Sequence, residues 1–273
     1  MKSLLIALAF IAALLVPALG RAQERVTIDV NDVGGGFISA FDYPKETTLS
    51  SGKTYDTNGI GIATKVAVTD IVSVEGRYEH VGLRNAQFFT EDRSSHGGRR
   101  GIMGRQTEPD QQAVGGVVGY WELSGSFKLP KTHGHSLLAG IANTKLDRDF
   151  LSSEVGDGTF SYALHASHIG FVLGGGGKQR VGNITFDYST RLYPRMSRKD
   201  SESSDGMSWP SPDSSSFGYE VRATATWMIA KHIGLTGGYE FRRLRTNESP
   251  NSSWPINENQ DSKLVLVGLR IGF

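Results

Sequence analysis

Apolar and polar residues alternate along ten segments of the chain. The segments are 26–41, 59–68, 71–83, 113–129, 136–146, 158–172, 179–193, 217–229, 232–245 and 263–273. Because side chains of a β-strand point alternately to two faces, each segment predicts a strand with one apolar and one mixed face. No helical heptad is present, so the predicted fold class is all-β.

The connections between these segments alternate in length. Four are short, namely 69–70, 130–135, 173–178 and 230–231, and five are long, namely 42–58, 84–112, 147–157, 194–216 and 246–262. Transmembrane barrels have short periplasmic turns and long extracellular loops. The pattern therefore predicts a transmembrane antiparallel up-and-down β-barrel of about ten strands, with eight as the alternative. A soluble β-domain would explain the alternation, but not why the long loops all fall on one side.

The last segment assigns the two faces. It alternates from Leu264 to Phe273 and ends the chain on an aromatic residue. Its odd-numbered positions, such as Val265 and Val267, are predicted to face lipid, whereas Leu266 and Arg270 are predicted to face the lumen.

The N-terminus resembles an export signal. Lys2 is followed by an apolar run at 4–19 and by small residues suited to cleavage. We predict that 1–22 is a signal peptide for Sec-type export and that 23–273 is a single barrel domain. A retained membrane anchor is the alternative, but the run is short for a spanning helix. With an even number of strands, both termini are expected in the periplasm.

Composition excludes several functions. The chain has no cysteine, so disulfides and thiolate metal sites are excluded. Its formal net charge of +1 gives no strong electrostatic attraction for nucleic acid. We expect no metal, no cofactor and no nucleic-acid partner. The mean hydropathy of −0.27 is compatible with a transmembrane barrel, because only every second residue of each strand faces lipid. The glycine runs at 34–36 and 174–177 are interpreted as a bend and a turn.

Charged residues recur on the predicted lumen face. Glu75 and Arg77, Glu220 and Arg222, and Glu240 and Arg242 each place an acid and a base two residues apart, roughly 6.5–7 Å along a strand. The predicted ion-pair network comprises Glu75, Arg77, Glu79, Glu122, Asp187, Arg191, Glu220, Arg222, Glu240, Arg242 and Arg270. Its near balance of charge favours a filled lumen over a selective pore, and about ten strands lie near the size that side chains can fill.

Over its mature length the chain resembles small bacterial outer-membrane β-barrel proteins, on the strength of the strand pattern, the signal and Phe273. The resemblance implies insertion by the barrel-assembly machinery, with Phe273 as the assembly signal. The omptin proteases are similar in length and strand number; His80, 91–92, His96 and 147–149 are expected at the same rim, although no omptin motif maps onto them.

The lipid A deacylases have a His-x-Ser pair on one strand, and His165-Ala166-Ser167 is similar to that pair alone. His165 and Ser167 are therefore the catalytic candidates.

The leading prediction is a non-catalytic integral outer-membrane protein with a charge-paired, filled lumen and surface loops for envelope integrity or surface contact. Outer-membrane lipids and lipopolysaccharide are the expected partners, because Arg side chains suit phosphate geometry. Their predicted contacts are Arg99, Arg100, Arg243 and Arg245. A narrow passive channel is the alternative function, and a rim-sited hydrolase is the second.

Overall fold

A computed structural model describes residues 26–42, 49–92, 111–132, 134–154, 158–204, 207–210, 214–247 and 257–273. Its strands are β1 (Val26–Asp42), β2 (Leu49–Ala67), β3 (Val72–Asp92), β4 (Gln111–Lys128), β5 (His135–Glu154), β6 (Gly158–Val181), β7 (Ile184–Ser204), β8 (Met207–Pro210), β9 (Ser214–Met228), β10 (Ile233–Asn247) and β11 (Asn257–Gly272). No helix in these ranges is long and apolar enough to cross a membrane.

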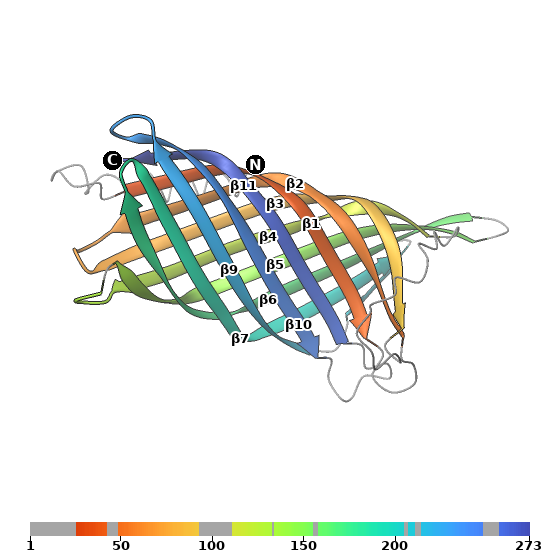
Figure 1. Ribbon diagram of the computed structural model, residues 1–273. Helices are drawn as coiled ribbons and strands as arrows, with labels where there is room; N and C mark the ends of the chain where they lie inside the picture. Colours follow the sequence, from red (N-terminus) through yellow and green to blue (C-terminus); the bar gives the residue numbers. More distant parts are fainter. Residues whose placement is uncertain are drawn as a thin grey trace.

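The strands form one closed antiparallel sheet (Figure 1). β1 pairs with β11 from Thr27 to Asp42, which closes the barrel, and the remaining strands pair with their neighbours along the chain. The short β8 pairs with Ser201–Ser204 at the end of β7, and β9 pairs with the same edge of β7 from Ile184 to Arg198. β8 therefore adds no further strand position to the ring. The ten-strand up-and-down barrel is therefore confirmed, and the eight-strand alternative is excluded.

The two ends of the barrel differ in their connections. At one end, here called the turn end, short turns join β2 to β3, β4 to β5, β6 to β7 and β9 to β10. Val26 and Phe273 meet at this end, where the Phe273 N–H donates to the Val26 carbonyl oxygen at 2.9 Å. At the opposite end, here called the loop end, the segments that connect the strands lie outside the described residues, apart from β8. The predicted signal peptide and the predicted contacts Arg99 and Arg100 also lie outside the described residues.

The strands are longer at the loop end than the sequence indicated. β3 and β7 reach 21 residues each, whereas about 9–11 residues cross a bilayer. β2 begins at Leu49 inside the predicted loop 42–58, and β7 continues to Ser204 inside 194–216. Polar residues dominate both faces of these extensions, so the apolar alternation that marks a strand is absent there.

The glycine run at 174–177 is not a turn. It lies within β6, and the turn is instead formed at Gly182, whose φ is +59°. A Cβ at Gly174 would lie 2.3 Å from the carbonyl oxygen of Thr190 on β7. Glycine is therefore required here by the close approach of two strands, rather than by a reversal of the chain.

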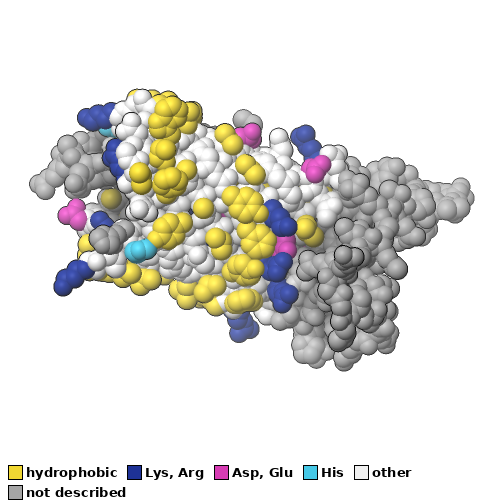
Figure 2. All heavy atoms as spheres, in the orientation of Figure 1, with side chains coloured by type: hydrophobic (Ala, Val, Ile, Leu, Met, Phe, Trp, Pro, Cys, Tyr) yellow, Lys and Arg dark blue, Asp and Glu magenta, His cyan; other side chains and the backbone are white. Residues whose placement is uncertain are grey.

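The two faces of the wall follow the predicted alternation. On β11, the side chains of Val265 and Val267 are 51% and 62% exposed on the outside, whereas Leu264 and Leu266 are 3% and 1% exposed in the lumen. Figure 2 shows the outer apolar side chains as a broad belt, with charged side chains gathered toward its two edges. The core of the protein thus lies inside the barrel.

Candidate functional site

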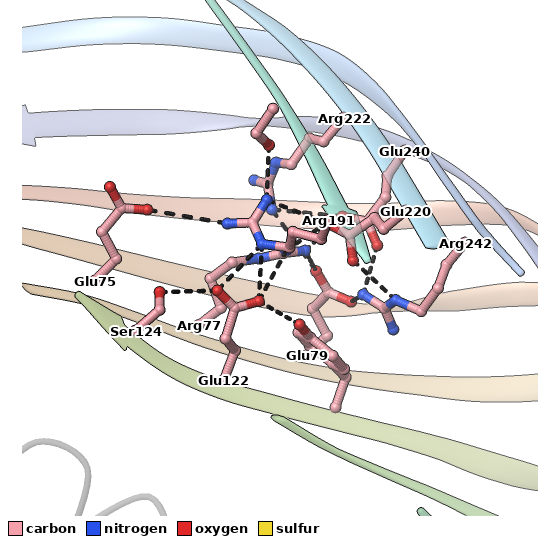
Figure 3. A network of polar contacts seen from close by, with 12 residues as sticks. Glu75, Arg77, Glu79, Glu122, Ser124, Arg191, Glu220, Arg222, Glu240 and Arg242 are labelled. Carbon is pink, nitrogen blue, oxygen red and sulfur yellow. Dashed lines mark hydrogen bonds and ion pairs between the residues drawn. The ribbon is translucent and has the colours of Figure 1, made fainter. Parts of the chain in front are cut away.

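A network of buried charges fills the middle of the lumen (Figure 3). We call it the plug. It consists of Glu75, Arg77, Glu79, Glu122, Arg191, Glu220, Arg222, Glu240 and Arg242. Strand register creates it, because acids and bases stand opposite one another on neighbouring strands. Glu220 of β9, for example, lies opposite Arg242 of β10 and Arg191 of β7.

Arg77 joins the two sides of the plug. From β3 its guanidinium contacts Glu220 at 2.5 Å, Glu240 at 2.6 Å and Glu79 at 2.7 Å. Two of these carboxylates lie on β9 and β10, across the lumen. Because its side chain is only 4% exposed, Arg77 acts as a buried crosslink between opposite walls of the barrel.

The carboxylates of the plug are shared between cations. Arg242 contacts Glu240 at 2.6 Å, Glu79 at 2.9 Å and Glu220 at 3.0 Å. Arg191 contacts Glu122 at 2.8 Å and Glu220 at 3.3 Å. Buried charges are tolerated only when they are well paired and hydrogen-bonded, and this sharing meets that requirement.

Two tyrosines complete the plug. The Tyr193 hydroxyl donates to Glu220 at 3.0 Å, the Tyr120 hydroxyl donates to Glu122, and the two hydroxyls lie 3.1 Å apart. The Arg242 guanidinium lies 3.7 Å from the centre of the Tyr120 ring. Tyr193 was not among the residues predicted for the lumen network, but its side chain is buried there. Tyr193 lies at an odd-numbered position of β7, as Arg191 does. The alternation of that strand therefore identifies Tyr193 as a lumen residue.

Asp187 and Arg270 lie apart from the plug, toward the turn end. Arg270 contacts Asp29 and Asp187, each at 2.6 Å. Asp29 was not identified from the sequence, although β1 places it directly opposite Arg270. Glu75 pairs with Lys65 at 2.6 Å.

The lumen on the loop side of the plug is packed. A layer of apolar and aromatic side chains comes first, consisting of Val33, Phe37, Tyr55, Val81, Leu83, Val118, Leu146, Ala166, Leu264 and Leu266. Beyond it, Glu258 contacts Arg198 at 2.7 Å and Arg148 at 3.0 Å. This second cluster was missed because its members fall in segments that the sequence assigned to loops.

Cavities in the lumen are unequal on the two sides of the plug. Between the plug and the turn end lies a hollow of about 220 Å³, here called the vestibule. On the loop side, the hollow beside Tyr120 and Ser262 measures about 10 Å³. A cavity needs about 10–15 Å³ on this measure to hold one water molecule. The loop-side hollow therefore holds one at most, and the plug and the apolar layer interrupt any wide water path among the described residues.

The catalytic candidates lie on the outer face of the wall. His165 Nδ1 of β6 is 2.9 Å from the Asp147 carboxylate of β5, and both side chains are about half exposed. Ser167 accepts a hydrogen bond from Asn143 at 3.2 Å. His80 is exposed, and Arg148 lies in the lumen; the side chains of the other predicted rim residues lie outside the described set.

The two described arginines of the predicted lipid site are also on the outer face. Arg243 pairs with Asp261 at 2.5 Å, and Arg245 is exposed on the same strand.

Comparison with solved structures places the fold among outer-membrane β-barrels. The chain is similar to the outer membrane protease OmpT from Escherichia coli, with 13% identity over 91% of this chain and 96% of that chain, and a TM-score of 0.58. It also matches the translocator domain of the autotransporter NalP from Neisseria meningitidis, with 9% identity over 98% and 95% of the two chains and a TM-score of 0.46. No protein-family model and no curated protein matches the sequence.

Proposed function

We propose that the protein is a non-catalytic integral barrel of the bacterial outer membrane, closed to solutes along its lumen, that supports envelope integrity or surface contact through its loop end. The observation that supports this most strongly is the plug, in which Arg77 bridges β3 to β9 and β10 at 2.5–2.6 Å. The narrow passive channel of the sequence-based prediction is the competing function.

Single-channel conductance in planar lipid bilayers separates these two functions. The purified full chain should insert without giving steady openings, because the plug and the apolar layer both occupy the lumen. Steady openings of the wild-type protein would establish the channel and contradict the proposal.

For the partners, we propose that Phe273 acts in assembly and that the arginines at the outer rim contact lipopolysaccharide. Phe273 supports assembly through its backbone pairing with Val26 at the closing seam. Arg243→Glu with Arg245→Glu should reduce the lipopolysaccharide that copurifies with the folded barrel. Lys131→Glu with Lys231→Glu, at exposed turns on the other end, reverses the same number of charges and is the matched control; equal retention in all three proteins would reject the lipid contact.

A second candidate function rests on the outer-face pair of His165 and Asp147. A carboxylate that holds Nδ1 of a histidine leaves Nε2 available to take a proton from a serine hydroxyl, and Ser167 lies two residues along on the same face. An ester bond in the lipid that surrounds the barrel would be the substrate.

Release of fatty acid from lipid vesicles tests this hydrolase. Wild-type protein should release acyl chains, and Ser167→Ala and His165→Ala should each abolish release. Ser136→Ala, a change of the same size on the lumen side, should keep it. Absence of release by the wild-type protein, or equal release by the Ser167 variant, would reject the hydrolase.

A further inference from the structure

The vestibule is a cavity of about 220 Å³ with a mixed polar and apolar lining, and it lies toward the turn end. Its wall includes Lys65, Glu75, Ser189, Arg222, Thr224 and Arg270. Since a cavity needs about 10–15 Å³ on this measure to hold one water molecule, the vestibule accommodates several waters or one small organic acid. The plug forms its floor.

Arg222 is the plug cation least engaged by carboxylates. Its contacts to Glu240 and Glu79 measure 3.5 and 3.7 Å, whereas Arg77 approaches the same two carboxylates at 2.6 and 2.7 Å. Arg242 also contacts both of them, at 2.6 and 2.9 Å. The two carboxylates therefore have closer partners, and the Arg222 guanidinium keeps donors for a further acceptor.

The vestibule is lined by more cations than acids. Its six cations are Lys65, Arg77, Lys178, Arg191, Arg222 and Arg270, and its three acids are Asp29, Glu75 and Asp187. Each of these acids already has a close partner, because Arg270 contacts Asp29 and Asp187 at 2.6 Å and Lys65 contacts Glu75 at 2.6 Å. The Arg222 side chain is 12% exposed at the floor, so a solute in the vestibule meets a cation whose own carboxylate contacts are long.

Hydroxyl groups stand next to Arg222. Strand register puts Ser189 of β7 directly opposite Arg222 of β9, and Thr224 lies one lumen position nearer the turn end. Ser189 Oγ accepts a hydrogen bond from Arg191 at 2.6 Å, so its own hydrogen remains available for donation. A guanidinium fork with neighbouring hydroxyl donors matches the paired oxygens of a carboxylate or a phosphate group.

The glycine run of β6 keeps this space open. Gly176 lies opposite Ser189 and borders the vestibule without a side chain. A Cβ at Gly176 would lie 2.4 Å from the carbonyl oxygen of Tyr188, so even alanine is disfavoured. The run therefore leaves volume beside the donors of the floor.

We propose that the vestibule is a binding site for a small solute bearing a carboxylate or phosphate group, which enters from the turn end and is held by Arg222, Ser189 and Thr224. The site depends on the proposed closed lumen only in that the plug forms its floor. Binding and conductance are measured separately, so either hypothesis can fail without the other.

Isothermal titration calorimetry of the detergent-solubilised full chain tests the site, with inorganic phosphate and acetate as separate probes. At least one probe should bind saturably, and the stronger one indicates whether the natural ligand is a phosphate or a carboxylate. Arg222→Gln should weaken binding about tenfold or more, since a hydrogen bond to a charged group contributes about 1.5–3 kcal/mol. Ser189→Ala should weaken it by a smaller factor.

Lys231→Gln is the matched control, because it removes one positive charge from an exposed turn outside the cavity. Its binding should equal that of the wild-type protein. No saturable binding of either anion, unchanged binding by Arg222→Gln, or equal loss in Lys231→Gln would each overturn the proposal. If Arg222→Gln does not give the heat-modifiable gel mobility of a folded barrel, Ser189→Ala and Thr224→Val replace it in the test. Weaker anion binding by these variants supports the site, and unchanged binding overturns the proposal.

Discussion

The two halves of the lumen are built from the same strands but are packed differently. Toward the turn end, charges such as Arg270 and Asp29 line a vestibule of about 220 Å³. Toward the loop end, the plug is followed by an apolar layer, and the hollow between them measures about 10 Å³. Polar lining alone therefore does not define a pore, because buried charges that share partners fill the barrel as completely as apolar side chains do.

The largest effect on stability is expected from Arg77→Met. The substitution removes the crosslink between opposite walls and leaves buried carboxylates underpaired, which typically costs about 3–5 kcal/mol. The measurement is the free energy of unfolding in denaturant, in lipid vesicles. Lys231→Met makes the same change of side chain on an exposed turn and should be neutral; equal stability of the two variants would show that the plug is not a stabilising crosslink.

A slightly smaller loss is expected in the apolar layer. Leu266 is 1% exposed, and Leu266→Ala should lower the free energy of unfolding by about 3 kcal/mol, through lost burial and a new cavity. The neighbouring Val267→Ala, on the outer face, should cost less than about 1 kcal/mol, since no packed cavity forms there. The same unfolding curves test both, and a larger loss at Val267 would reverse our assignment of the two faces.

The smallest effect is expected in the vestibule. Lys65 pairs with Glu75 at 2.6 Å but its side chain is 49% exposed, and exposed pairs contribute about 0–1 kcal/mol. Lys65→Met should therefore leave the unfolding free energy nearly unchanged. A loss as large as that of Arg77→Met would mean that the vestibule is as tightly packed as the plug.

Much of the wall was predictable from the sequence, and the reason is periodicity. Lipid selects apolar residues at every second position, so 263–273 alone separates Val265 from Leu266. The same signal fails at the loop end, where both faces of β2 and β7 are polar and the strands continue unnoticed. It also fails at 174–177, because a glycine run is typical of turns as well as of close strand contacts.

Partners across the lumen were less predictable than faces. The spacing of Glu240 and Arg242 places both on the inner wall, but the 2.6 Å contact of Glu240 with Arg77 joins strands far apart in sequence. Such contacts depend on the curvature and closure of the barrel, which no local pattern encodes. Arg148, Arg198 and Glu258 were missed for a simpler reason, since their segments were interpreted as loops.

Thiol labelling tests the central claim, that the lumen is open toward the turn end and closed beyond the plug. The chain has no native cysteine, so Ser136→Cys in the vestibule and Ser262→Cys on the loop side of the plug each provide a single reactive site. A charged methanethiosulfonate reagent should modify Cys at 136 rapidly and leave Cys at 262 unmodified until the barrel is unfolded. Equal rates at the two positions in the folded protein would contradict a closed lumen.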